Sequence, residues 1–118
     1  MKTSSAKAKG RRFQQEIRDI LLETFKELEP DDIRSTSMGA SGEDLLLSPA
    51  ARKLIPFAIE AKNQETTSVW QWMKQAEENA NGHIPIVVFT RNRSKNYAVL
   101  EFEQLVGLLE EMNKLKNK

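Results

Sequence analysis

The sequence predicts a single α/β domain with a mixed β-sheet and helices on both of its faces. Three observations predict this class. The length of 118 residues fits one domain, and hydrophobic residues make up 39% of the chain, which is enough for one compact core. Apolar residues recur with helical and strand periodicity in the order α-βββ-α-ββ-α. Because a predicted helix joins the third strand to the fourth, we expect these two strands to be parallel neighbours.

The expected elements follow one another with short links. In order, they are a helix at 10–28, strands at 33–37, 45–47 and 57–62, a helix at 68–80, strands at 84–89 and 97–101, and a helix at 102–115. The first helix carries its apolar side chains on one stripe, and Pro30 ends it. Ser48 and Pro49 begin a turn after the second strand. The stretch 84–89 is apolar at almost every position, which is typical of a central strand covered on both faces.

Composition excludes several kinds of site. The chain has no cysteine and one histidine, so it cannot build a disulfide scaffold, a thiolate metal site or a site with two imidazoles. No apolar run approaches the roughly 20 residues that a membrane span needs, so we expect a cytoplasmic protein without membrane contact. Residues 1–9 are small, polar and basic, and we expect them to form a flexible arm in front of one domain at residues 10–118.

Basic residues are clustered, although the net charge is only +1. One cluster lies near the N-terminus and another lies in the polar turn before the last strand. Lysine and arginine bind nucleic acid by releasing counterions from its phosphates. The alternative is that these charges only keep the protein soluble, and composition does not choose between the two. The residues that would contact nucleic acid in the first interpretation are Lys7, Lys9, Arg11, Arg12, Arg91 and Arg93.

Two acids and a lysine form the pattern with the clearest chemical meaning. Glu60 and Lys62 lie two residues apart in a predicted strand, so their side chains point to the same face. Asp44 opens the preceding strand, and tight antiparallel pairing would bring it beside Glu60. Two carboxylates this close repel each other unless a cation or a proton lies between them. Mg²⁺ prefers such oxygen ligands, so the pattern indicates a metal site.

The Glu-x-Lys triplet is not specific by itself, because chance alone gives about one in a chain of this composition. A cross-strand or surface ion pair is the alternative interpretation. The context favours a metal site, since apolar residues flank the triplet in its strand. In addition, the acid at position 44 directly follows a glycine-serine loop at 38–43.

These motifs resemble the PD-(D/E)XK nuclease superfamily and, more narrowly, the archaeal-type Holliday junction resolvases, which also occur in phages. The resemblance runs from residue 9 to about residue 89. Its motifs are Lys9-Gly10-Arg11 with Glu16 in the first helix, Gly42-Glu43-Asp44, and Ile59-Glu60-Ala61-Lys62. It implies a restriction-endonuclease-like fold and a Mg²⁺-dependent endonuclease of four-way DNA junctions, active in DNA recombination and repair. Mn²⁺ would substitute for Mg²⁺, and a phage-encoded enzyme would act in the host cytoplasm.

The resemblance also implies a role for each residue of the acidic site. Asp44, Glu60 and the backbone carbonyl of Ala61 would hold the metal. Glu16 would complete the acidic site from the first helix, although periodicity alone does not distinguish it from other glutamates there. Lys62 would orient or activate the attacking water and stabilise the charge that develops on the phosphate.

Two further polar residues, Ser41 and Gln75, are placed to touch DNA, with an ordinary loop serine and a solvated helix glutamine as the alternatives. The chain departs from the family pattern at Glu43, where the family name has proline. Trp70 and Trp72 could stack on bases, but we expect both to pack against the protein. Two other functions stay open: a nuclease of this superfamily that acts on flaps, DNA ends or restriction targets, and a non-catalytic DNA-binding module.

We expect a two-fold homodimer, because a four-way junction must be cut on two opposed strands and one domain offers one acidic site. The last helix supports this expectation, since its apolar arc spans roughly 180°, wider than a helix on one sheet needs. The apolar residues beyond those that the sheet covers would then face a partner chain, the first helix or solvent. The expected core stripe is Phe102, Leu105, Val106 and Leu109, and the excess is Leu108, Met112 and Leu115.

Overall fold

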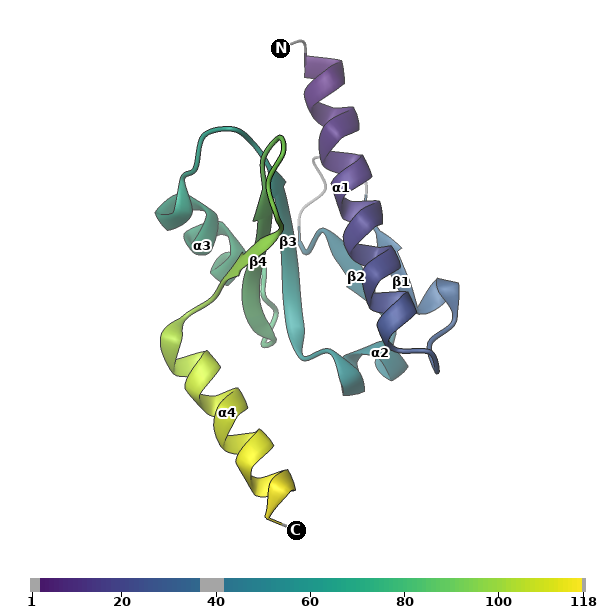
Figure 1. The fold of residues 1–118 in the computed structure, drawn as a ribbon, viewed down its shortest axis with the longest axis vertical. Coiled ribbons are helices and arrows are strands. Elements are labelled where there is room, and N and C mark those ends of the chain that lie inside the picture. The colour runs from purple at the N-terminus through teal and green to yellow at the C-terminus, as the bar shows by residue number, and fades with distance from the viewer. Residues whose placement is uncertain (1–2, 37–41, 118) are drawn as a thin grey trace.

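The computed structural model describes residues 3–36 and 42–117, and it confirms the α/β class (Figure 1). Its elements are α1 (Thr3–Thr24), the 3-10 helix η1 (Pro30–Asp32), β1 (Ile33–Ser35), β2 (Leu45–Leu47), α2 (Pro49–Leu54), β3 (Phe57–Asn63), α3 (Val69–Glu78), β4 (Ile84–Thr90), β5 (Tyr97–Val99) and α4 (Phe102–Lys116). Parallel and antiparallel strands flanked by helices are compatible with a restriction-endonuclease-like fold.

The central sheet has the strand order β3-β4-β5. β4 runs parallel to β3 and antiparallel to β5. Because α3 connects β3 to β4, the predicted parallel pair with a helical crossover is confirmed. The register pairs Glu60 with Val87 and Lys62 with Phe89, so the predicted site lies on the parallel pair.

β1 and β2 form a separate two-stranded antiparallel sheet, whereas we predicted one mixed sheet. The link between β2 and β3 is made near Asp44. Its N–H donates to the Ile59 carbonyl at 3.0 Å, and its carboxylate accepts the Ala61 N–H at 2.7 Å. The Asp44 side chain thus accepts the Ala61 N–H, which a backbone carbonyl would accept if β2 and β3 were regularly paired. The strands therefore form two separate hydrogen-bonded sheets instead of one.

Helices cover both faces of the central sheet, with α1 on one side and α3 on the other (Figure 1). The larger core lies on the α1 side, where Phe13 packs with Ile59 of β3 and Ile86 of β4. The smaller core lies on the α3 side and contains Trp72 and Val87. The sheet is thus buried from both sides, as the apolar sequence of β4 predicts.

The first helix and the turn after β2 differ from the prediction. We expected a flexible arm at residues 1–9, but α1 begins at Thr3, because the polar sequence before Gly10 contains no helix-breaking residue. α2 replaces the turn expected at Ser48. The Ser48 hydroxyl accepts the Ala51 N–H at 3.1 Å, and Pro49 occupies the first helical position, which together are a helix start signal. In the described residues no helix is long and apolar enough to cross a membrane.

Two predictions about packing are wrong. Trp72 is buried as expected, but Trp70 is 90% exposed, because it lies on the side of α3 that faces away from the sheet. α4 contains no buried residue, and it extends away from the rest of the molecule (Figure 1). Its expected core stripe is therefore exposed, since α4 leaves the sheet after β5 instead of lying on it. The exposed members of the stripe are Phe102, Leu105, Val106 and Leu109.

Candidate active site

Side-chain alternation along β3 creates the candidate site. Ile59 and Ala61 pack in the α1-side core, so Glu60 and Lys62 point to the opposite face of the sheet, toward α3. Asp44 reaches the same place from the turn before β2, where its carboxylate accepts the Ala61 N–H at 2.7 Å. The structure thus brings together three of the residues that the sequence predicts for the site.

The two carboxyl groups perturb each other. Glu60 is only 3% exposed, and this burial raises its pKa to about 7, with the charge of Asp44 adding to the rise. Burial also raises the pKa of Asp44, against the opposing effects of the Ala61 N–H and the Lys62 ammonium. Both shifts mean that the doubly ionised pair is destabilised in the protein. A positive charge between the two carboxylates would stabilise their doubly ionised form.

The donor set fits a divalent cation that prefers oxygen ligands. Asp44 and Glu60 supply two adjacent carboxylates whose repulsion a cation would remove. Mg²⁺ commonly binds through one or two carboxylates and keeps several waters, so two acids are sufficient. The Ala61 carbonyl stays the predicted backbone ligand.

α3 contributes a polar partner to each of the two residues on β3. Lys62 Nζ donates to Gln75 Oε1 at 3.1 Å, and Asn79 Nδ2 donates to Glu60 Oε1 at 3.1 Å. Gln75 was predicted, but as a DNA contact. The sequence analysis missed Asn79, although its position four residues after Gln75 places both on one side of the helix end and could have indicated it.

Glu43, the residue at which the chain departs from the family pattern, has a structural partner. Its side chain is 7% exposed and forms an ion pair with Arg52 of α2. Arg52 also donates to the Phe57 carbonyl at 2.7 Å. The pair therefore ties the residue before Asp44 to the start of β3, and so fixes the two segments that carry the acids.

Glu16 lies apart from the acidic pair. Its side chain is exposed on α1, and its carboxylate accepts a hydrogen bond from Asn96 Nδ2 at 2.8 Å. In residues 3–36 and 42–117, no three acidic or imidazole side chains gather closely enough to hold one metal ion. The reason is topological, since α1 covers the face of the sheet opposite to Glu60. As a metal ligand, Glu16 stays a prediction that this arrangement does not support.

Predicted DNA contacts from two distant segments line one groove. Lys9 and Arg12 on α1 face Arg91 and Arg93 of the β4–β5 turn across a hollow of about 460 Å³. Asn63, the residue that follows Lys62, also lines this hollow. The groove and the acidic pair therefore lie near the same end of β3, on opposite sides of the strand.

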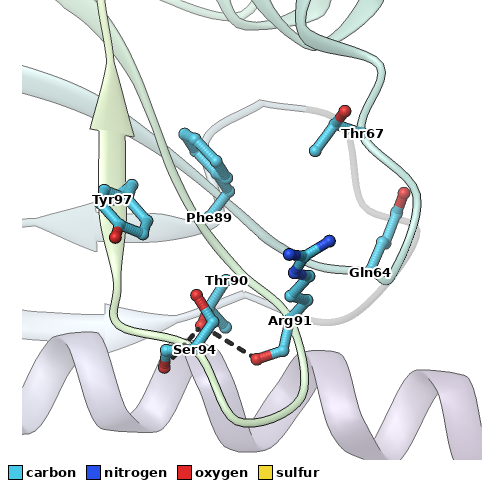
Figure 2. A pocket seen from close by; sticks show the side chains of 7 residues that line it. All are labelled: Gln64, Thr67, Phe89, Thr90, Arg91, Ser94 and Tyr97. Atoms are coloured by element: carbon cyan, nitrogen blue, oxygen red, sulfur yellow. Dashed lines mark hydrogen bonds between the residues drawn. The ribbon is translucent and has the colours of Figure 1, made fainter.

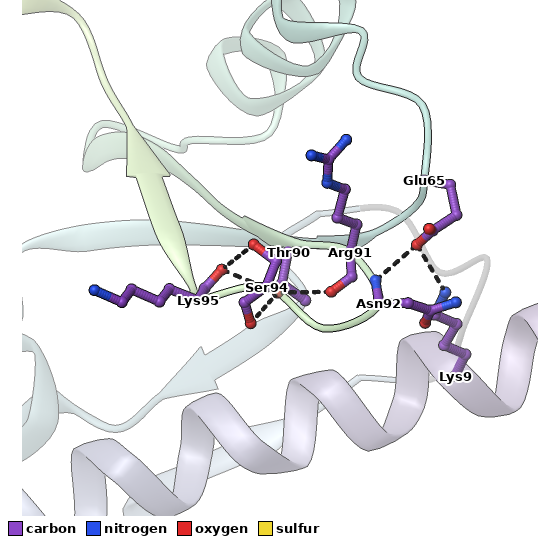
Figure 3. A network of polar contacts seen from close by, with 7 residues as sticks. All are labelled: Lys9, Glu65, Thr90, Arg91, Asn92, Ser94 and Lys95. Carbon is purple, nitrogen blue, oxygen red and sulfur yellow. Dashed lines mark hydrogen bonds and ion pairs between the residues drawn. The ribbon is translucent and has the colours of Figure 1, made fainter.

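A small polar network holds the groove together (Figure 3). The Glu65 carboxylate accepts the Asn92 N–H at 2.7 Å and forms an ion pair with Lys9 Nζ at 3.6 Å. The Asn92 N–H, more than the Lys9 charge, lowers the pKa of Glu65. This network joins α1, the loop after β3 and the β4–β5 turn, so it fixes the spacing between the two basic segments.

The remaining predicted DNA contacts are less informative. Lys7 and Arg11 are exposed on α1, and Arg11 lies beside Arg12 in a second, shallower hollow. Ser41 lies outside the described residues.

Comparison with known proteins agrees with this geometry. The family model described as "Phage putative PDDEXK endonuclease" matches residues 5–118, which is nearly the whole chain. No curated protein and no solved structure gives a significant match. The family match covers the acidic pair, Lys62 and the basic groove. The chain therefore belongs to the phage PDDEXK endonuclease family, within the PD-(D/E)XK superfamily.

Proposed function

We propose that this endonuclease depends on Mg²⁺ and cuts branched DNA, with the four-way Holliday junction as its substrate, in recombination and repair. The observation that carries the proposal is the buried pair of Asp44 and Glu60 with Lys62 on the same face of β3. A pure DNA-binding module gains nothing from carboxylates beside phosphates, because they repel the ligand. The acidic pair therefore favours hydrolysis over binding alone.

Hydrolysis joins a water oxygen to phosphorus and breaks one P–O bond of the DNA strand. When bound by Asp44 and Glu60, a divalent cation would supply Lewis-acid activation and neutralise charge on the phosphate. Lys62 would add a fixed positive charge where negative charge develops, and it would orient the attacking water. Gln75 holds the Lys62 ammonium, and Asn79 holds the Glu60 carboxylate.

The basic groove supports DNA as the substrate. Four cationic side chains from α1 and the β4–β5 turn line it, and it begins one residue after Lys62. Phosphate contacts of this kind position a duplex and supply affinity without reading its sequence.

We infer in addition that two chains pair through α4, which gives the dimer two acidic sites for two opposed strands. Its exposed apolar residues recur at alternating spacings of three and four, as in a coiled-coil seam. Glu101 and Glu103 lie at its start, and Lys114 and Lys116 in its last turn. Antiparallel pairing brings the acids of one helix to the lysines of the other, so the charges favour a second copy. The residues of the seam are Phe102, Leu105, Leu109 and Met112.

The size of the protein in solution tests this interface. We expect a dimer at micromolar concentration and a monomer for the double variant Leu109→Glu, Met112→Glu, whose fold should be unchanged because α4 has no buried residue. The matched control is Glu110→Gln, which alters the same helix outside the seam. An intact dimer in the double variant would move the interface elsewhere, and a wild-type monomer that also stays monomeric on junction DNA would refute pairing.

Cleavage of synthetic DNA tests the function itself. A four-way junction, a flap, a duplex and a single strand are incubated with Mg²⁺ or with EDTA. We expect junction cleavage with Mg²⁺ only, and none of the other substrates cut at a comparable rate. Preference for the flap would indicate a different nuclease of the superfamily, and binding without cleavage of any DNA would indicate a non-catalytic module.

A further inference from the structure

A row of side chains crosses the central sheet beside the candidate site. The strand register pairs Lys62 with Phe89, and Phe89 with Tyr97. Paired residues on neighbouring strands point to the same face, so these three side chains lie in line. The Phe89 ring contacts the Trp72 ring of α3 at 5.6 Å between centroids, which identifies this face as the one that also carries Glu60.

A hollow of about 330 Å³ opens at the end of this row. Figure 2 shows the rings of Phe89 and Tyr97 on one side of it, and the side chains of Gln64, Thr67 and Arg91 on the other. The two ring centroids are 6.0 Å apart with a tilt of 33°, and Tyr97 is 54% exposed, so its ring faces solvent at the edge strand. The hollow thus combines an accessible aromatic surface with an amide, a hydroxyl and a guanidinium.

We propose that this hollow binds one unpaired nucleobase of the DNA next to the cleaved phosphodiester, which rests on the proposed function and defines its substrate further. A base needs a flat apolar partner for its face and hydrogen-bonding groups for its edge, and the ring of Tyr97 and the amide of Gln64 offer both. Arg91 adds a cation for the neighbouring phosphate. The volume lies at the lower end of the range for small-molecule sites, as a single base requires.

The position of the hollow fits a base close to the cut. Tyr97 lies two strands from Lys62, which is roughly 10 Å at the usual spacing of strands, or about the span of one or two nucleotides. A base inside a duplex is stacked and paired, so its face cannot reach the ring. Only a nucleotide freed from its duplex, such as one at the branch point of a junction, can enter, and the hollow therefore contacts an unpaired base beside the cut.

Trp70 is the rival stacking residue, because it is the most exposed aromatic side chain in the described part of the chain. It does not line the hollow. It therefore serves as the matched control for Tyr97: both are large exposed aromatics, but only Tyr97 lies in the row that begins at Lys62.

Binding measured in EDTA, without cleavage, tests the proposal. The probes are a fluorescein-labelled strand of twelve thymidines and a strand of twelve abasic sites, which has the same charge. We expect the wild type to bind the thymidine strand about tenfold more tightly than the abasic strand. Tyr97→Ala should lose this preference and keep the affinity for the abasic strand, whereas Tyr97→Phe and Trp70→Ala should keep the preference.

A preference that persists in Tyr97→Ala, or that disappears in Trp70→Ala, would overturn the proposal, as would a wild type that binds both strands equally. Circular dichroism of each variant establishes that it folds, and Tyr97 is exposed enough to be replaced without a buried cavity. Failure of this inference and failure of the proposed function give different experimental results. A wild type that cleaves the junction but shows no base preference refutes this inference alone, and a Tyr97-dependent preference without any cleavage refutes the nuclease alone.

Discussion

Replacing Glu60 by glutamine should stabilise the metal-free protein at high pH. The pKa of Glu60 rises to about 7 in the folded protein, because the group is buried beside Asp44. Above this value, folding keeps a charged carboxylate in a place that disfavours it. Glutamine has nearly the same shape as the protonated acid, and its Oε1 can still accept the hydrogen bond from Asn79. The variant therefore removes the unfavourable charge and keeps the contact.

The size of the stabilisation follows from the shift in the pKa of Glu60. A carboxyl group moved from an ordinary pKa of 4.5 to about 7 loses roughly 3 kcal/mol of folding free energy at a pH above both values. Since Asp44 is partly exposed, water screens some of the repulsion, and we expect about 1–2 kcal/mol at pH 8. The penalty is fully present above the folded pKa and is mostly lost as the pH falls to 4.5, where the folded state is protonated and the unfolded state is half protonated. Most of the gain in Glu60→Gln should therefore be lost at pH 4.5.

Urea unfolding in EDTA at pH 8 and pH 4.5, followed by circular dichroism, measures the effect. Glu77→Gln is the control, because Glu77 is exposed on α3, and it should change stability by less than about 0.5 kcal/mol. Added Mg²⁺ should stabilise the wild type more than Glu60→Gln, since the variant lacks one carboxylate. If Glu60→Gln is no more stable than the wild type at pH 8, or keeps its full advantage at pH 4.5, burial beside Asp44 does not raise the pKa of Glu60 as described.

Three other predictions concern catalysis, packing and DNA binding. Lys62→Ala should reduce junction cleavage at least a hundredfold with little change in junction affinity, because it removes charge only where the phosphate reacts. Arg52→Ala leaves the buried Glu43 unpaired and should cost about 2–4 kcal/mol in urea unfolding, whereas Glu111→Ala, which breaks the exposed pair with Lys114, should cost less than about 0.5 kcal/mol. Deleting residues 1–8 removes two lysines and should weaken binding to every DNA form and reduce the salt slope by about two.

Each of these has a clear contrary result. Cleavage at the wild-type rate by Lys62→Ala would refute its role in the reaction. Equal stability of Arg52→Ala and Glu111→Ala would mean that the Glu43 pair contributes no more than a surface contact. An unchanged salt slope after the deletion would show that the start of α1 does not contact phosphates, provided that the melting temperature stays the same.

The sequence alone determined the strand that carries the chemistry. Alternation along β3 puts Glu60 and Lys62 on one face whatever surrounds them, because the period of a strand is two residues. The apolar run of β4 and the helix before it likewise determined the parallel pair. These features depend on local spacing and on the rule that parallel strands need a crossover. Both features can therefore be predicted from the order of the residues along the chain.

The tertiary structure decided which side chains face each other across elements. Glu16 lies in α1 and Asn79 caps the C-terminal end of α3, yet only Asn79 reaches Glu60, because α3 covers that face of the sheet and α1 covers the other. The exposure of Trp70 and of α4 was decided in the same way. Periodicity gives the direction of a side chain relative to its own helix axis. Where that helix lies, and what it covers, depends on contacts between residues far apart in the chain, which no local pattern contains.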